Sequence, residues 1–370
     1  WMIQGVLWIS RQSYVMLTIG HVPFLWVLLF YFMTGLWIWK KNGQNRHIRI
    51  SLAYVIMIIL IWIPMARRKS LAFLDVGQGD CFVADTKSGA IIFDGGSSSE
   101  DQVGRYRILP YMKYLGYQKI QIAVISHMDI DHYSGIKELL EMGKIKYLGL
   151  PEIPKDETMK KIIGIAKKRG TTIFYLSRGR QITTKDGSLK VLHPQKNSQM
   201  EKNAASLVMQ GKILGYRVLL TGDVEKEGEE ELLSEELERA DILKAAHHGS
   251  KNSTSNEFLQ KVQPKQTVIS CGKQNRYGHP HLETIHRLQT YRTKIYRTDQ
   301  SGAIIFFKRR DGQKKRYTIK SYRKRCKEYE ENIRRYQDKY IRTFLSILRG
   351  RKIYDLPDEK PVKESISFRR

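Results

Sequence analysis

The sequence predicts a layered α/β domain that follows an apolar, membrane-type segment, and three observations lead to this fold class. Short β-rich runs such as "LAFLDV", "AIIFDGG" and "RVLLTGD" begin only after residue 70. Helical patterns such as "GIKELLEMGK" and "ETMKKIIGIAKKRG" lie between several of these runs, and strands interleaved with helices are typical of a layered α/β fold. Before residue 70, two long apolar runs contain no charged residue.

The two apolar runs have the length of membrane-spanning helices. They cover residues 22–39 and 50–66, and both carry tryptophan and tyrosine near their ends, as interfacial anchors do. A signal peptide and a buried helical hairpin are the alternatives. Basic residues in the loop between the runs favour a cytoplasmic loop, with everything after residue 70 outside, although "RRK" at 67–69 opposes this orientation.

Composition divides the chain into three expected parts: a membrane segment (1–69), the α/β domain (70–312) and a basic charged tail (313–370). Because the chain opens at Trp1 in the middle of an apolar pattern, we expect it to be the C-terminal piece of a longer protein.

Sixty-four basic residues against 37 acidic ones give a formal net charge of +27, which favours nucleic acid or anionic lipid as a partner. Three dispersed cysteines exclude a zinc ribbon and a disulfide framework.

Acidic and imidazole side chains follow the predicted strands. They are Asp75, Asp80, Asp94, His127, Asp129, Asp131, His132, Asp223, His247 and His248. Ligands of open α/β sheets gather beyond the carboxyl ends of the strands, and mixed imidazole and carboxylate groups suit Zn²⁺, Mn²⁺ or iron. Each segment alone is compatible with an ordinary turn or helix cap. Their joint occurrence, each after an apolar strand, favours a dinuclear metal site.

The spacing within "HMDIDH" suggests how two ions would be held. His127 and Asp129 can face one ion from an extended turn, while Asp131 and His132 can begin the next helix and face a second ion. A later carboxylate such as Asp223 can bridge the two ions.

The combined pattern, H-x-D-x-D-H, then T-G-D, then a later histidine, resembles the metallo-β-lactamase superfamily. The longer runs "LDVGQGDC", "SHMDIDHYSG", "NAASLVM", "VLLTGDVE", "LKAAHHGSKNSTS" and "RYGHPH" are similar to the C-terminal domain of ComEC-type competence proteins, membrane channels that take single-stranded DNA into bacteria. The resemblance covers roughly residues 71–310. It implies a four-layer αββα sandwich preceded by two transmembrane helices, in a multi-pass protein of the bacterial cell membrane with the sandwich outside the cytoplasm.

The resemblance also assigns the metal ligands. They would be His127, Asp129, Asp131, His132, Asp223 and His247, with Asp75, Asp80 and Asp94 in supporting loops. Between His247 and His248 the choice stays open; His247 is the preferred ligand and His248 the preferred proton-transfer group. Asp129 stands where a second histidine is common, and Asn203 with Ser206 is the more family-like feature where a third histidine is expected, with His193 a weak candidate. Such an oxygen-rich set makes Mn²⁺ as credible as Zn²⁺. No organic cofactor is expected.

The predicted activity is metal-dependent phosphodiester hydrolysis, degrading the DNA strand that is not transported. Two divalent ions would activate water, with Asp131 accepting or orienting its proton and Asn203 and His248 supporting the reaction. His279 would protonate the leaving oxygen or bind a phosphate, and Lys251 and Arg276 are candidate phosphate contacts. The alternatives are a catalytically degenerate module that guides DNA and a membrane-bound phosphodiesterase for small substrates.

Overall fold

The computed structural model describes residues 20, 22, 24–39, 51, 52, 55, 69–235, 237–308 and 317–321. The chain divides into two compact units, Trp1–Ser321 and Tyr322–Arg370, and all the described residues belong to the first. Most of the second apolar run (50–66) and of the expected basic tail (313–370) lies outside the described residues.

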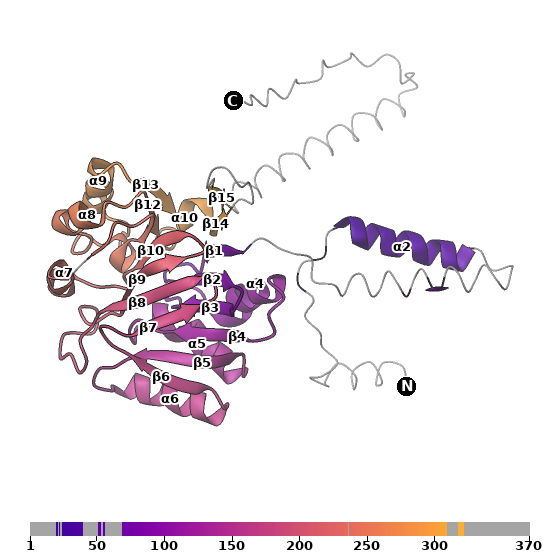
Figure 1. Ribbon diagram of the computed structural model, residues 1–370, viewed down its shortest axis with the longest axis horizontal. Helices are drawn as coiled ribbons and strands as arrows, with labels where there is room; N and C mark the ends of the chain where they lie inside the picture. The colour runs from indigo at the N-terminus through magenta and orange to yellow at the C-terminus, as the bar shows by residue number, and fades with distance from the viewer. Residues whose placement is uncertain are drawn as a thin grey trace, which may run out of the picture. The chain divides into compact units, whose positions relative to one another are not determined.

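Two sheets form the body of the α/β domain (Figure 1). The first sheet has the strand order β15 (Tyr317–Ser321), β14 (Ile304–Lys308), β1 (Ser70–Phe73), β2 (Phe82–Thr86), β3 (Gly89–Phe93), β4 (Ile120–Val124), β5 (Ile145–Pro151) and β6 (Thr172–Leu176). The second has the order β13 (Lys294–Arg297), β12 (Gln266–Ile269), β11 (Ile242–Lys244), β10 (Tyr216–Leu220), β9 (Val208–Ile213), β8 (Gly187–His193) and β7 (Gln181–Thr184). The neighbouring strands from β3 through β6 pair in parallel in the first sheet, as do those from β10 through β13 in the second.

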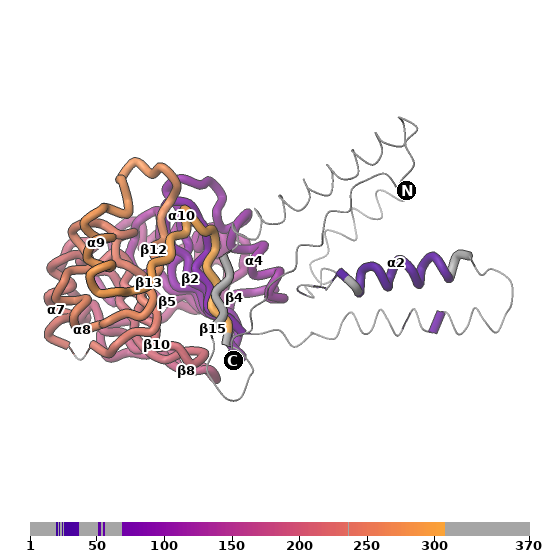
Figure 2. The backbone as a smooth tube through the Cα atoms, turned by 90° about the horizontal axis from the view of Figure 1, so that it is seen from above, coloured from indigo at the N-terminus to yellow at the C-terminus, as the bar shows by residue number. Residues whose placement is uncertain are grey.

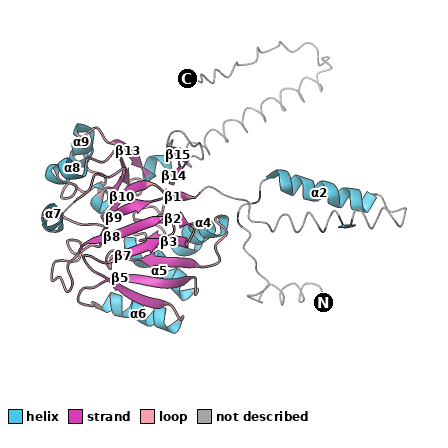
Figure 3. Ribbon diagram, viewed as in Figure 1, coloured by secondary structure: helices cyan, strands magenta, loops and turns pink. Residues whose placement is uncertain are grey.

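Helices cover the two outward faces of the sheets. On the first sheet they are η1 (Gly104–Ile108), α4 (Leu109–Tyr114), α5 (Ile130–Glu141) and α6 (Glu157–Lys168). With the second sheet go α7 (Lys226–Leu233), η2 (Ala246–Gly249), α8 (Asn256–Val262), α9 (Leu282–Thr290) and α10 (Thr298–Ser301). In Figure 3 the strands occupy the middle of the domain, and in Figure 2 the group α7, α8 and α9 lies on the side opposite α4.

Alternating side chains along the strands build three separate apolar cores, which defines four layers. Leu71 and Phe73 of β1 face the second sheet, where they share a core with Val218 of β10, whereas Ala72 packs beneath the helices of the first sheet. Leu219 of β10 faces the other way and packs with α8 and α9. The layered α/β fold predicted from the sequence is therefore confirmed.

Local sequence explains the start of α6, whereas α7 is shorter than its sequence pattern. The carboxylate of Asp156 accepts from the Met159 N–H over 2.7 Å and caps α6, whose buried residues Met159, Ile162 and Ala166 recur at helical spacing. In "EGEEELLSEELERA" the helical pattern extends to Ala240, but α7 ends at Leu233.

The first predicted membrane run contains the helix α2 (Phe24–Trp39), an apolar helix of 16 residues. Its side chains Phe24, Tyr31 and Phe32 are exposed. Within the described part of the chain, no helix combines the length and the apolar character that crossing a membrane requires. Of the second run, only residues 51, 52 and 55 are described, and they are helical.

The edge strand β15 lies inside the segment assigned to the basic tail. Its backbone pairs antiparallel with β14, from Ile304 opposite Ser321 to Lys308 opposite Tyr317. The alternating pattern "YTIKS" suits a strand, so the first sheet takes in five residues of that segment.

Candidate metal centre

The candidate site lies where the carboxyl ends of strands from both sheets meet. Asp94 directly follows β3, His127 and Asp129 follow β4, and Asp223 follows β10. Because β3 and β4 are parallel, as are β10 and β11, the loops after these strands open at one rim.

The loop between β1 and β2 is locked onto the start of α5, and this brings Asp80 to the rim. The Asp80 N–H donates to the Asp131 carbonyl over 3.0 Å, and the Gly96 N–H donates to the Asp80 carbonyl over 3.1 Å. A Cβ at Gly79, whose φ is +156°, would overlap the Gly96 carbonyl. A Cβ at Gly96 would lie 2.5 Å from the His132 nitrogen, so this close approach requires glycine at both positions.

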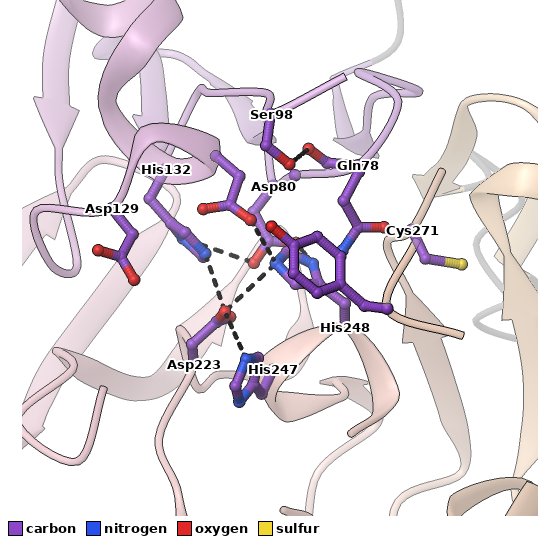
Figure 4. A network of polar contacts seen from close by, with 12 residues as sticks. Gln78, Asp80, Ser98, Asp129, His132, Asp223, His247, His248 and Cys271 are labelled. Carbon is purple, nitrogen blue, oxygen red and sulfur yellow. Dashed lines mark hydrogen bonds and ion pairs between the residues drawn. The ribbon is translucent and has the colours of Figure 1, made fainter. Parts of the chain in front are cut away.

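Four buried side chains form the centre of the site: Asp80, His132, Asp223 and His248. Each offers one ligand atom, and these atoms all lie within 4.8 Å of one another. One oxygen of Asp223, Oδ2, is 3.2 Å from the Nε2 atoms of both His132 and His248 (Figure 4). Asp223 therefore sits between two imidazoles from α5 and η2, which belong to different halves of the fold.

The other ring nitrogen of each imidazole is already engaged. Nδ1 of His132 donates to Asp94 over 2.9 Å, and Nδ1 of His248 donates to the Ser270 carbonyl over 2.8 Å. Neither Nε2 atom has a hydrogen-bond partner within the described residues, although both are buried. With Nδ1 engaged in this way, each Nε2 can exchange its proton for a cation, and metal-ligating histidines are oriented by such partners.

Dense negative charge dominates the electrostatics of the four-residue group. Burial lowers the pKa of His248, but the carboxylates of Asp223 and Asp80 outweigh it and raise the value to about 10. Burial also lowers the pKa of His132, but the charges of Asp223 and Asp94 outweigh this effect and raise the pKa well above its ordinary value. Burial raises the pKa of Asp223, but His132, His248 and Lys244 hold it well below its usual range. The group therefore favours positive charge at its centre.

A buried lysine, Lys244, supplies part of that charge and was missed by the sequence reasoning. Its Nζ donates to the Gly222 carbonyl over 2.7 Å and to Asp223 Oδ1 over 3.2 Å, and it forms an ion pair with Asp80. Burial lowers the Lys244 pKa, but Asp80 and Asp223 raise it above its ordinary value. The detectable signal was a lysine at the end of the otherwise apolar strand β11.

His127 and Asp129 form a second, more open half of the site. The His127 ring is buried 4.2 Å from the His132 ring, and its Nε2 is 3.5 Å from Asp129 Oδ2. The other oxygen of Asp129 pairs with Lys202 at 2.5 Å, and the Asp129 side chain is 36% exposed. Burial raises the Asp129 pKa, but His127 and Lys202 together lower it. This half holds fewer converging ligands than the buried group.

The adjacent histidines of η2 differ in what they face. Both have left-handed backbone angles, with φ of +46° at His247 and +52° at His248. His248 Nε2 points into the group, 3.4 Å from Asp131 Oδ2 as well as 3.2 Å from Asp223. His247 instead pairs through Nδ1 with Glu225 at 2.9 Å, and its Nε2 lies 3.9 Å from Asp223. The geometry thus favours His248 over His247 as a ligand.

A sequence model described as "Metallo-beta-lactamase superfamily" matches residues 74–273, more than half of the chain. The chain belongs to the metallo-β-lactamase superfamily. Among curated proteins, it is 35% identical over 294 residues to ComE operon protein 3 of Bacillus subtilis, covering 74% of this chain and 38% of the relative. It is 30% identical over 250 residues to competence protein ComA of Neisseria gonorrhoeae, covering 65% of this chain and 32% of the relative. These relatives are ComEC-type competence proteins, and the chain spans about a third of their length.

Among solved structures, the metallo-β-lactamase fold protein YhfI of Bacillus subtilis aligns with a TM-score of 0.44 and 12% identity, over 63% of this chain and 98% of YhfI. The likeness concerns the fold alone. The match to the family model gives the fold, and the Asp/His cluster at its rim, with the buried Nε2 atoms of His132 and His248, fits a metal ion.

The remaining predicted residues of the metallo-β-lactamase domain surround this cluster at different distances. Half-buried His279 has its ring 5.4 Å from that of His247 and 6.2 Å from that of His248. Burial and the charges of His248 and His247 lower its pKa to about 4. Asn203 lies in the turn that leads to Ser206, whose hydroxyl accepts from the Asp223 N–H over 3.2 Å.

The weak third-histidine candidate, His193, belongs to a different cluster. Its Nε2 donates to the Ala204 carbonyl over 2.8 Å, and its Nδ1 lies 3.3 Å from Glu231. The ring therefore links β8 to the turn at Ala204 and to α7.

The predicted phosphate contacts are on the surface. Lys251 is exposed, and its backbone N–H donates to His281 Nδ1 over 3.2 Å. Arg276 is exposed in the loop before His279, where it donates to the Tyr277 hydroxyl over 2.6 Å. The supporting-loop residue Asp75 is half-buried near the start of the β1–β2 loop, and its carbonyl accepts from Arg107 over 3.3 Å.

Proposed function

We propose that the domain is a metal-dependent phosphodiesterase that acts on DNA, the nuclease part of a DNA-uptake channel that degrades the strand not taken up. The observation that carries this proposal is the buried group Asp80, His132, Asp223 and His248, with imidazole Nε2 atoms free to bind a cation. The excess of 27 positive charges suits a polyanionic substrate, and the relatives are named for competence.

The residues divide into two sets of ligands. His132, Asp223 and His248, with Asp131 and Asp80 beside them, would hold one ion in the buried half. His127 and Asp129 would hold a second ion in the open half, where Asp129 is now paired with Lys202. His247 thus becomes a neighbour that pairs with Glu225, the reverse of the preferred sequence assignment.

Divalent Mn²⁺ or Zn²⁺ at this site would polarise the phosphoryl group and promote ionisation of water. The chain supplies the rest. Asp94 and the Ser270 carbonyl fix the rings of His132 and His248, while Asp131 accepts or orients the proton of the attacking water. His279, Lys251 and Arg276 stay predicted contacts for the leaving oxygen and the phosphates, and Asn203 stays a predicted catalytic residue.

The membrane context is part of the same proposal. The apolar runs at 22–39 and 50–66 are proposed as the last transmembrane helices of a multi-pass bacterial membrane protein, with the metallo-β-lactamase domain outside the cytoplasm. The part of the relatives that this chain does not span would supply the rest of the channel.

Two observations favour a second candidate function, a DNA-guiding module without catalysis. Asp129 is paired with Lys202, and His193, the weak candidate for a third histidine, is engaged with Ala204 and Glu231. The open half of the site is therefore poorer in ligands than the buried half, and a module with one ion would still bind nucleic acid through its charge.

Metal analysis combined with a cleavage assay separates these functions. The full chain is dialysed against Mn²⁺ or Zn²⁺, its metal content is determined, and it is incubated with single-stranded DNA and with bis(p-nitrophenyl) phosphate. We expect bound metal and DNA cleavage, both lost in Asp223→Ala and both retained in His286→Ala, an exposed histidine on α9.

The other outcomes have distinct meanings. Bound metal without cleavage of either substrate favours the guiding module. Cleavage of the small diester alone favours a small-substrate phosphodiesterase. If the full chain retains no metal, or Asp223→Ala retains as much as the unmodified chain, the proposed centre is wrong.

A further inference from the structure

An exposed loop beside the metal centre carries a stack of three flat side chains. The Tyr277 ring is stacked on the His279 ring, with centroids 5.7 Å apart and planes 20° from parallel. The guanidinium of Arg276 lies 4.9 Å from the centre of the Tyr277 ring and donates to its hydroxyl. Tyr277 is 42% exposed, so a large aromatic surface faces solvent at this point.

The stack is connected to the metal centre through His279. The His279 ring contacts the rings of both His247 and His248, and His248 lies in the four-residue group. The His279 ring thus connects the Tyr277 ring to the histidines of η2.

The loop is held in one conformation by Asn275. Its side-chain Nδ2 donates to the Gly272 carbonyl over 3.0 Å and to the His279 carbonyl over 2.6 Å, while its Oδ1 accepts from the His279 N–H over 3.0 Å. These three bonds join both ends of the loop across the stack. Tyr277 is thus presented on a preorganised support, which reduces the entropy lost when a ligand binds.

The chemistry of the stack fits an unpaired nucleobase. Aromatic rings and guanidinium planes stack on bases of any sequence, and the exposed cations Lys251, Lys273 and Arg276 suit the phosphates on either side. A base inside a duplex is covered on both faces by its neighbours, so such a platform binds single strands. Resting on the proposed function, we propose that Tyr277 stacks on a base of single-stranded DNA in place of the Arg276 guanidinium, which then contacts a phosphate.

Binding is tested on the full chain by fluorescence anisotropy, in EDTA so that no strand is cleaved. The probes are a labelled oligothymidine and an abasic oligomer of equal length, which has the same charge and no bases. Tyr277→Ala is expected to weaken oligothymidine binding about tenfold, the size of loss that follows removal of one base–aromatic stack. Binding of the abasic oligomer should stay within twofold (about 0.4 kcal/mol) of the unmodified chain.

Two further variants control this result. Tyr277→Trp keeps a flat ring and should bind oligothymidine as the unmodified chain does. Tyr114→Ala, at an exposed tyrosine that stacks on Tyr111 of α4, should change neither affinity. A thermal melt of each variant reports whether it is folded.

The inference is overturned if Tyr277→Ala binds oligothymidine like the unmodified chain, or if the abasic oligomer loses affinity equally. Because binding is measured without cleavage, this failure is distinct from failure of the nuclease proposal. A chain that binds through Tyr277 and cleaves no DNA would contradict the nuclease activity alone.

Discussion

The Nδ1–H of His132 donates to Asp94 over 2.9 Å, and both side chains are completely buried. The second oxygen of Asp94 accepts from the Ser126 N–H over 2.7 Å, which ties the end of β3 to the end of β4. Asp94 thus fixes both the ring of His132 and the strand end that carries His127. A carboxylate of this kind orients a ligand and makes it more basic without binding the metal itself.

Replacing Asp94 with asparagine is expected to weaken metal binding while the site keeps its shape. Asparagine is nearly the same size, but it lacks the charge that holds the His132 proton on Nδ1. Loss of such a partner reduces metal affinity about 10- to 100-fold. Titration of the metal-free chain with Mn²⁺ or Zn²⁺ in a calorimeter measures this change.

The matched control is Asp85→Asn, another fully buried carboxylate, which pairs with Lys69 and Tyr117 away from the metal centre. It should alter stability and leave metal affinity unchanged. Equal affinities for the Asp94→Asn variant and the unmodified chain would show that Asp94 has no orienting role.

The two histidines of η2 should differ in their effect on metal binding. His248→Ala removes an Nε2 atom that lies 3.2 Å from Asp223, so we expect loss of the tightly bound ion. His247→Ala removes a ring that is 3.9 Å from Asp223 and paired with Glu225, and we expect most of the metal to be retained. Metal content after dialysis is the measurement. A larger loss in His247→Ala would restore the original sequence assignment.

The strand ends of the site were predictable, and the reason is physical. Apolar runs followed by Asp94, by "HMDIDH" and by "TGD" had to be strands ending at a polar rim, because parallel neighbours share their carboxyl edge. Which histidine of "HHGS" faces inward could not be derived in this way. It depends on left-handed backbone angles at His247 and His248, a conformation that residues other than glycine rarely adopt.

Lys244 and Tyr277 show two further limits of the sequence. Lys244 lies two residues after Ile242 on the same face of β11, and Ile242 packs between the sheets. An apolar residue is therefore expected at position 244, and the sequence alone gives no role for a lysine there. Its partner Asp80 comes from the β1–β2 loop of the other sheet, 164 positions away in the numbering, and only the sheet packing brings them together. Tyr277 resembles any loop tyrosine until its stack with His279 is seen.

The tail beyond residue 321 is expected to contact phosphates without sequence preference. Its run "YRKRCKEYEENIRRYQDKY" is rich in lysine, arginine and tyrosine. Deleting residues 322–370, after the end of β15, should make the dependence of DNA affinity on salt concentration shallower, because fewer counterions are released. Binding isotherms at several salt concentrations give the slope. A slope identical to that of the whole chain would mean that the tail does not touch DNA.

Lys244→Met is expected to destabilise the domain strongly, and added metal should restore part of the loss. The ammonium neutralises Asp80 and Asp223 in a fully buried setting, and removing one partner of a buried ion pair costs about 3–5 kcal/mol in unfolding free energy. A divalent cation can compensate the carboxylate charge left unpaired in the variant, so Mn²⁺ should stabilise the variant more than the unmodified chain. Urea unfolding with and without Mn²⁺ measures both effects.

The matched control is Lys265→Met, at a lysine that is 68% exposed and paired with Asp241, which should lower the unfolding free energy by no more than about 1 kcal/mol. If the two variants unfold alike, Lys244 is not part of the charge balance of the site.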